Sequence, residues 1–590
     1  MSSKPVNDVT VSGVSSFLEE LYCGRLRWDF LVPFPEQEAE DRITGDSLVS
    51  DVQDFLVRNV NPTAIDEKKE ISPEVLEYLR SAGYFKLQGG PEVGGLGLSD
   101  LNTFRVIEAI CSWSIPVALV VAIENSIGMA PLVSLVPDGP LRDLLVERVS
   151  AGLVSCFADT EPTGAANHKR DTSAIPSDDE GHYVVSGEKV YSGNAPLAEL
   201  IGILATVKEH GTEIRRLFVF DPETPGLRRS AAHEFMGIKG FPNGALSLSD
   251  AVISRDRMFV EPPTGYDSRL TAKAGGLPIL GRMYLIAAPS LAISKLCLTW
   301  SRDFATRRMV DGVPLGDYEE IQRLLAESLA DTYAIESVSE WALLCGLRNL
   351  NPRFEQHAAK NISSVLCWRI VDSTMSLLAA EGFETGPSKA RRGAPAVPLE
   401  RFFRDARGLR ISGGVDFQLD NWMSNIVIFS YYRAGLAGIA ADVAASVATA
   451  ERITMALSTR NQEHFRYVED GVGRFCELCT EISDRYGDDR ELFAHERLMI
   501  CVARVANELF VMALVLARAV RPDQASGLSR EDLADLYCTR ARRRIAALHT
   551  EIADLSDAPD VAYSKLSSDW LSGQEAAETL ADIITVTPPT

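Results

Sequence analysis

The sequence changes its hydrophobic pattern twice along its length, and this order limits the folds open to the chain. Over residues 11–150, apolar residues recur at helical spacing, as at Val75 and Leu79. Over residues 155–263, short β-branched and aromatic runs are separated by Gly, Pro, Asp and Asn. After residue 274 the helical spacing returns. We therefore predict helices, then an antiparallel sheet or barrel, then helices to the end of the chain.

Charge and composition exclude several classes of partner. The sequence has 59 Lys and Arg against 82 Asp and Glu, a net charge of −23, so a nucleic acid partner is not expected. The first residues lack an apolar targeting region and the apolar runs are interrupted by charge, so we predict a cytoplasmic protein with no transmembrane segment. Ten cysteines are too few for a disulfide scaffold. The close pair Cys476 and Cys479 lacks further ligands, so no metal site is predicted.

Five short strings stand in a distinctive order and spacing. They are PEVGGLGL at 91–98, TEP at 160–162, GEKVYSGN at 187–194, FMGIK at 235–239 and RDAR at 404–407. In this order the strings resemble the acyl-CoA dehydrogenase family. The segment 16–35 and the helical region 493–552 are similar to parts of its very-long-chain branch. The resemblance therefore covers essentially the whole chain.

The resemblance implies an α+β fold that is mainly α. The expected domains are an N-terminal α-domain (1–152), a central antiparallel β-domain (153–265), a four-helix domain (266–432) and an additional helical domain of the very-long-chain type (433–590). In the family, FAD lies between the β-domain and the helices, and its pyrophosphate end reaches the neighbouring subunit. The resemblance thus implies FAD, an acyl thioester on coenzyme A or a carrier protein, and a homodimer or a pairing with a homologous subunit.

The proton-accepting residue of the family is missing. Dehydrogenation of an acyl thioester needs a base for the α-proton and donors to the developing enolate oxygen, while hydride leaves for the flavin. Most relatives supply this base from a Glu-Gly-Thr string, where this chain has Gly413 in the Glu position and Val415 in the Thr position. A minority place it before an Arg on another helix, here Gly281 before Arg282. Glycine cannot accept a proton, so the catalytic residue is unassigned. The candidate replacement carboxylates are Asp416, Glu381, Glu384 and Asp159.

The family's Trp-Ile-Ser/Thr-Asn flavin string is altered here. It reads Tyr191-Ser192-Gly193-Asn194, so an aromatic ring and one hydroxyl remain. The hydroxyl comes one position early, on the opposite strand face if the register holds. The resemblance also places Asp159 and Thr160 near the flavin pyrimidine, where an Asp159 carboxylate would oppose an anionic reduced flavin.

The contacts that receive the neighbouring subunit's FAD are reduced. The family's Gln-x-x-Gly-Gly-x-Gly string runs here from Ser376 to Gly382, with two alanines in place of glycines. Arg307 stands where relatives bind the pyrophosphate, and an interface ion pair is the alternative role for it. The expected cofactor contacts are Asp159, Thr160, Tyr191, Ser192, Gly193, Arg307, Ser376, Gly382 and Val415.

The thioester side combines altered and retained positions. A serine near the pantetheine end is replaced by Ala165, and the cluster 168–170 (His-Lys-Arg) either meets coenzyme phosphates or is a solvated loop. Glu124 lies in an apolar run on a helix that borders the acyl site in relatives, so its carboxylate is paired or perturbed. The expected substrate contacts are Glu124, Ala165, Arg282 and Gly413.

Three functional hypotheses follow. The leading one is a divergent flavin-dependent oxidoreductase acting on an acyl thioester, whose proton acceptor has moved or comes from the substrate. The second is a flavin-dependent monooxygenase-type or non-redox enzyme on the same fold, which needs no α-proton base. The third is a catalytically inactive pseudo-dehydrogenase or partner subunit. An electron-transfer flavoprotein is implied as acceptor only if the chain dehydrogenates.

Overall fold

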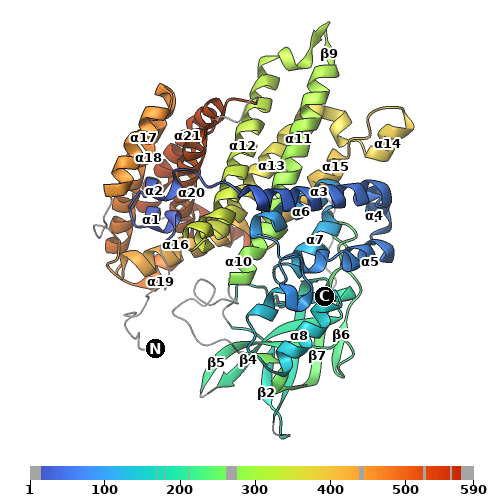
Figure 1. Ribbon diagram of the computed structural model, residues 1–590. Coiled ribbons are helices and arrows are strands. Elements are labelled where there is room, and N and C mark those ends of the chain that lie inside the picture. The colour runs from blue at the N-terminus through green and yellow to red at the C-terminus, as the bar shows by residue number, and fades with distance from the viewer. Residues whose placement is uncertain are drawn as a thin grey trace.

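The computed structural model describes residues 15–167, 169–179, 181–209, 211–260, 276–437, 444–522, 527–557 and 561–572. A β-sheet lies at one end of the molecule, and helices from the N-terminal and C-terminal parts of the chain fill the rest (Figure 1). His168, the first residue of the predicted His-Lys-Arg cluster, lies outside the described residues.

Three of the N-terminal helices begin at a residue whose side chain caps the helix. The Ser16 hydroxyl accepts a hydrogen bond from the Glu19 backbone N–H, and the Glu19 side chain accepts one from the Ser16 N–H. Asn61 precedes Pro62 and caps its helix by accepting hydrogen bonds from the Thr63 and Ala64 N–H groups. These helices are α1 (Phe17–Tyr22), α2 (Trp28–Leu31), α3 (Ala39–Asn59), α4 (Pro62–Lys68), α5 (Pro73–Ser81), α6 (Asp100–Trp113), α7 (Ile115–Glu124) and α8 (Pro140–Ser150).

The β-rich stretch forms one sheet whose strand order is β6-β7-β3-β2-β4-β5-β8, with β1 paired to β4. The strands are β1 (Ser155–Ala158), β2 (Ser173–Pro176), β3 (His182–Gly193), β4 (Leu200–Glu209), β5 (Thr212–Phe220), β6 (Leu227–Arg229), β7 (Asn243–Ser254) and β8 (Met258–Phe259). Most pairs are antiparallel, as predicted, but β1 and β2 each pair with β4 in parallel. Long connections allow parallel pairing, whereas only adjacent hairpin strands must be antiparallel.

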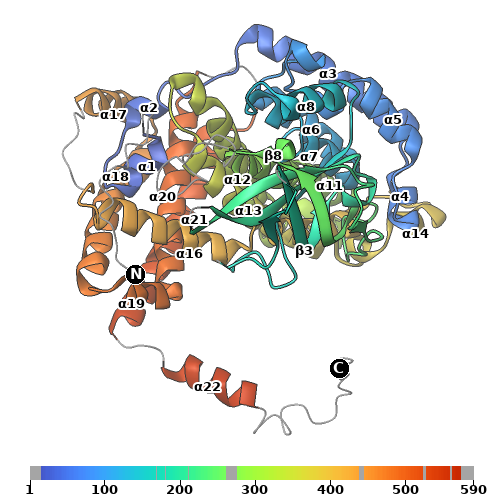
Figure 2. The same cartoon turned by 90° about the horizontal axis from the view of Figure 1, so that it is seen from below.

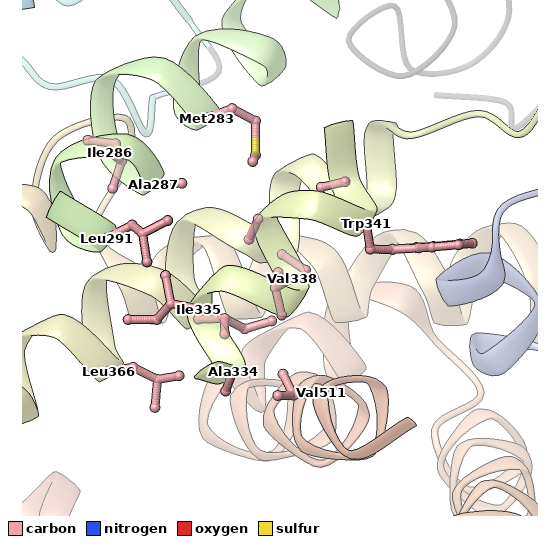
Figure 3. Packing of buried hydrophobic residues seen from close by; sticks show 14 of the residues in the cluster. Met283, Ile286, Ala287, Leu291, Ala334, Ile335, Val338, Trp341, Leu366 and Val511 are labelled. Atoms are coloured by element: carbon pink, nitrogen blue, oxygen red, sulfur yellow. The ribbon is translucent and has the colours of Figure 1, made fainter. Parts of the chain in front are cut away.

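A set of long helices follows the sheet. They are α10 (Leu277–Arg282), a π-helical turn (Met283–Ala287), α11 (Ala288–Arg307), α12 (Glu319–Leu344), α13 (Arg353–Phe383), α14 (Gly386–Arg391), α15 (Leu399–Leu409) and α16 (Asp416–Val427), with a small hairpin of β9 (Met309–Val310) and β10 (Val313–Pro314). Their facing apolar side chains form a core, part of which Figure 3 shows. It includes Ile286, Leu291, Ile335, Val338, Leu366 and Val511.

Most of the last helices pack beside the first two, but the final one extends away from them (Figure 2). They are α17 (Ala444–Ala456), α18 (Thr459–Arg485), α19 (Asp489–Ala494), α20 (Glu496–Ala519), α21 (Arg530–Asp557) and α22 (Val561–Ser572), after a π-helical turn (Ile428–Tyr432). Helices α1 and α2 lie among α17, α18 and α20 in both views (Figures 1 and 2). The Trp28 ring stacks on Phe465 with centroids 4.4 Å apart. The two ends of the chain thus share one core.

Three helical segments are long and apolar enough to cross a membrane by length and composition: Leu277–Arg307, Arg353–Phe383 and Glu496–Ala519. The fold buries 72%, 56% and 83% of their most apolar stretches inside the protein. The expectation that no segment spans a membrane stays a prediction.

Candidate functional site

The turn at the end of β3 presents an aromatic ring outward and a hydroxyl inward. A bulge between Lys189 and Ser192 shifts the register against β7, and Tyr191 has a left-handed φ of 56°. The Tyr191 side chain is 64% exposed, with its ring centroid 5.5 Å from that of His233, while Ser192 is buried. The sequence predicted the direction of Ser192 on the condition that β3 keeps a regular register. That condition fails, because the bulge adds a residue before the turn.

Polar atoms without partners gather at this turn. Four buried side-chain atoms have no hydrogen-bond partner among the described residues: Ser192 Oγ, Asn194 Oδ1, Asn243 Oδ1 and His233 Nε2. The Asn243 amide donates to the Tyr191 carbonyl at 3.1 Å, which places these groups on neighbouring strand ends. Buried polar atoms without partners are costly, so a cluster of them points to a ligand that would satisfy them.

Glu124 is buried at the C-terminal end of α7 and is fully engaged with the β-domain. Its Oε1 accepts hydrogen bonds from the Ser155 backbone N–H at 2.7 Å and from Asn194 Nδ2 at 2.9 Å, and its Oε2 accepts one from the Ser155 hydroxyl at 2.6 Å. Burial raises the pKa of Glu124 to about 8. The sequence placed this residue at the acyl site, and the structure adds its link to the turn at Asn194.

The segment that follows β1 carries two acids whose charges are compensated. The Asp159 carboxylate pairs with Arg215 of β5, so its charge is offset by a cation. Glu161 accepts hydrogen bonds from Lys189 Nζ at 2.8 Å and from the Asp171 and Thr172 N–H groups. Burial opposes ionisation of Glu161, but these donors hold its pKa down at about 2. The Thr160 carbonyl accepts from the Val190 N–H at 2.9 Å, which joins this segment to β3.

The two family base positions converge on one arginine. Arg282 Nε donates to the Gly413 carbonyl at 3.2 Å, and its Nη1 lies 2.9 Å from His357 Nδ1. A Cβ built on Gly413 would lie 3.6 Å from Arg282 Cγ, and one on Gly281 would lie 3.2 Å from Ile127. Gly413 has φ 70°, a conformation that favours glycine. The structure thus brings Arg282 into contact with Gly413, while a side chain at Gly281, the residue before Arg282, would face Ile127 and Ser126.

The side chain of Lys360 holds the loop that carries Gly413 by bonding to backbone carbonyls of that loop. The buried Lys360 Nζ donates to the carbonyls of Gly414 at 2.6 Å and Arg410 at 3.2 Å. Burial lowers the pKa of Lys360 to about 8. Val415 occupies the N-cap of α16 without a side-chain bond, where the family's Thr would carry a hydroxyl.

All four candidate replacement carboxylates form ion pairs with arginines. The pairs are Asp416 with Arg410, Glu381 with Arg307, Glu384 with Arg392 and Asp159 with Arg215. Although burial alone would raise it, the Arg410 bond holds the pKa of Asp416 below its usual range. The Arg392 bond lowers the pKa of Glu384. A carboxylate stabilised in its charged form is a weak base, so these shifts argue against a base role for Asp416 and Glu384.

The region predicted to receive a partner's FAD is also reorganised. Ala379 has φ 50° and ψ −134° inside α13, a glycine-like conformation where relatives have glycine. Arg307 pairs with Glu381, which lies two residues after the Ala379 kink. Ser376 is exposed and Gly382 is buried beside Leu399.

On the predicted thioester side, Ala165 is exposed, and its carbonyl accepts a hydrogen bond from Arg170 at 2.8 Å.

Sequence reasoning missed several residues that the fold brings to the site. His233, Asn243, His357 and Lys360 lie outside the quoted strings, and only long-range pairing places them there. Over the part of the chain that the structure describes, no group of three or more His, Cys, Asp or Glu side chains is arranged to hold a metal ion.

Family models match this architecture along the chain. The acyl-CoA dehydrogenase N-terminal domain matches residues 45–136, the middle domain 156–251 and the C-terminal domain 281–418. The chain belongs to the acyl-CoA dehydrogenase family. The predicted family and the predicted fold class are both confirmed.

Individual members of the acyl-CoA dehydrogenase family match over different lengths. The probable acyl-CoA dehydrogenase FadE10 of Mycobacterium tuberculosis is 26% identical over 589 residues, covering 95% of this chain and 89% of the relative. The mitochondrial very long-chain specific acyl-CoA dehydrogenase of Mus musculus is 25% identical over 414 residues, covering 68% and 60%. A Bacillus anthracis acyl-CoA dehydrogenase complexed with FAD superposes with a TM-score of 0.73 at 19% identity and covers 96% of both chains. At that identity the superposition shows the fold.

Proposed function

We propose that this chain is a divergent, FAD-binding oxidoreductase that acts on an acyl thioester carried by coenzyme A or a carrier protein. The observation that carries the proposal is the set of partnerless buried atoms at the turn after β3: Ser192 Oγ, Asn194 Oδ1 and Asn243 Oδ1. A flavin pyrimidine and its ring nitrogens offer both donors and acceptors to such atoms. The residues present therefore fit the group that the family binds there.

The residues proposed to hold the flavin have distinct tasks. The exposed Tyr191 ring supplies a flat apolar face, and Ser192 and Asn194 supply polar contacts. FAD, when bound, supplies the hydride acceptor for oxidation of the acyl group. Thr160 lies beside this turn through its carbonyl bond to Val190.

The proposed assembly is a homodimer. Arg307 ends α11, next to the β9 hairpin and at the opposite end of the molecule from the sheet (Figure 1). A helix of 20 residues spans about 30 Å, so Arg307 cannot reach a flavin held at the β3 turn of its own chain. A second copy is therefore needed for Arg307 to meet the pyrophosphate. A cytoplasmic location and an electron-transfer flavoprotein as acceptor belong to the same proposal.

The chemistry is proposed to differ from plain α,β-dehydrogenation. Neither Gly281 nor Gly413 offers a base, and the alternative carboxylates are held in arginine pairs. The cationic Arg282 is the charged side chain that contacts Gly413. The proposed proton acceptor has therefore moved to another residue or is supplied by the substrate.

The first test is the visible absorption spectrum of the purified protein, which should show bound oxidised flavin that bleaches with a suitable thioester. A colourless protein that also fails to bind added FAD would contradict the proposal.

The second test is the Gly413→Glu variant. A Cβ at this position has room, and the left-handed backbone costs about 1–2 kcal/mol. We expect acyl-CoA dehydrogenase activity to appear in Gly413→Glu and not in Gly413→Ala, measured with a dye acceptor. The Ala variant is the matched control because it carries the same backbone strain without the carboxylate. Equal activity in both variants would show that the base is not what the site lacks.

A second candidate function is a catalytically silent partner subunit, and the Arg307–Glu381 pair favours it. The Glu381 carboxylate competes with phosphate for the guanidinium of Arg307, the arginine proposed to bind the pyrophosphate. Glu381→Gln should therefore raise FAD affinity several-fold at low salt, as followed by flavin fluorescence, and this gain should shrink as salt is added. If Glu381→Gln remains unable to bind FAD and Gly413→Glu stays inactive, the silent-partner function is the better account.

A further inference from the structure

The Glu124 carboxyl joins two parts of the fold at the proposed cofactor site. It ends α7 in the N-terminal part of the chain, and its hydrogen bonds from Ser155 and Asn194 all come from the β-domain. Ser155 opens β1, and Asn194 closes the turn after β3. The Ser155 hydroxyl also accepts a hydrogen bond from the Met129 N–H at 2.9 Å, which links the residues after α7 to the same point.

Packing around Glu124 is close enough to make this junction stiff. A Cβ on Gly193 would fall 2.4 Å from Ile123 Cδ1, so α7 presses directly on the strand end. A Cβ on Gly128 would fall 2.7 Å from Ser155 Oγ. Asn194 adopts a left-handed φ of 63°, and its N–H donates to the Pro242 carbonyl at 2.6 Å. The Asn194 side chain is thus fixed on both sides.

We propose that Glu124 is a positioning residue, which holds the Asn194 amide so that its carbonyl oxygen faces the cofactor site. This inference rests on the proposed function, because it takes FAD to be the ligand of this site. Because Asn194 Nδ2 donates to Glu124, the amide cannot rotate without losing that bond, and Oδ1 is left as the acceptor with no partner among the described residues. The role differs from the substrate contact that the sequence suggested for Glu124.

The charged side chains near Glu124 bond to other groups, so the Glu124 carboxyl is the group that orients the Asn194 amide. Glu199 is occupied with Arg80 and with the Val154 N–H, and Arg229 donates to the Ala198 carbonyl. Cys156 is buried beside Glu124, and burial raises the pKa of its thiol above the usual range. A glutamine at 124 would keep Oε1 for the two N–H donors and could donate to Ser155 Oγ. The conservative variant should therefore preserve the positioning.

The first experiment is a double-mutant cycle on FAD binding with the full chain. Glu124→Ala and Asn194→Ala should each weaken FAD binding by roughly fivefold or more, and the double variant should be no weaker than the worse single variant. Glu124→Gln should bind within about twofold of the unaltered protein. Additive losses in the double variant, or equal losses for Glu124→Ala and Glu124→Gln, would overturn the positioning role.

The second experiment needs no FAD, so it separates this inference from the proposed function. Amide hydrogen exchange of peptides covering residues 190–195 should be at least about tenfold faster in Glu124→Ala and near the unaltered rate in Glu124→Gln. Glu355→Gln is the control, because Glu355 is another fully buried carboxyl whose pKa burial raises to about 7, but it contacts the Leu18 N–H. Unchanged exchange in Glu124→Ala, or equal acceleration in Glu355→Gln, would show that Glu124 does not hold this turn.

Discussion

At the scale of single residues, the charged groups of this chain are defined by their partners more than by their positions in a motif. Asp159 was expected to repel a reduced flavin, yet it pairs with Arg215, which lies 56 residues away in sequence. Glu381 pairs with Arg307 across 74 residues. A motif comparison shows that an acid is present, whereas the fold decides whether it is free to act as a base.

The buried pair of Glu161 and Lys189 gives a prediction at this scale. The pKa of Glu161 is held down at about 2, below its usual 4.5, so the pair stabilises the fold above about pH 4.5 and this stability is lost as the pH falls toward 2. Glu161→Gln leaves the Lys189 ammonium buried without its counter-ion, which costs about 3–5 kcal/mol at pH 7. Urea unfolding at several pH values should show this deficit shrinking between about pH 4.5 and 2. A deficit that stays constant over that range would contradict the assignment.

At the scale of elements, the contact between α7 and the end of β3 requires a glycine. Gly193→Ala would place a methyl group 2.4 Å from Ile123 Cδ1 and 2.9 Å from Phe241 Cζ, so we expect a loss of about 1–3 kcal/mol in the free energy of unfolding. The matched control is Gly473→Ala on α18, where a Cβ meets nothing within 4 Å and helix propensity favours alanine by about 1 kcal/mol. Thermal unfolding of the two variants should therefore shift in opposite directions. A stabilised Gly193→Ala variant would mean that α7 and β3 are further apart.

The elements also show what the sequence could and could not predict. The change from helical to strand periodicity located the sheet, because it depends on local residue pattern alone. The bulge before Ser192 and the parallel pairing of β4 with β1 and β2 depend on contacts between distant segments, so no local pattern indicated them. The same holds for the site: the strings placed Tyr191 and Gly413, while His357 and Lys360 come from the first turns of the long helix α13, outside any string. The domain boundaries and the roles of the site residues stay predictions.

At the scale of the whole molecule, the N-terminal helix is part of the C-terminal core. Phe17 is fully buried, and its ring centroid lies 6.3 Å from that of Trp28, 6.4 Å from that of Trp341 and 6.3 Å from that of Phe510. Phe17→Ala should therefore lower the free energy of unfolding by about 3–5 kcal/mol. The control is Ile43→Ala on α3, whose side chain is 69% exposed and should change it by less than about 0.5 kcal/mol. Similar midpoints of chemical unfolding for the two variants would contradict the shared core.

This joining of the two ends has a consequence for how the protein is made. The Leu18 N–H donates to Glu355, which is 337 residues further along the chain, and Phe510 follows later still. At about 5–20 residues per second, a ribosome needs roughly 25–100 s to reach Phe510 after Phe17 has been added. During that interval the apolar side chains of α1 lack their final partners. We therefore expect the nascent chain to expose this apolar segment to unwanted association until the last helices emerge.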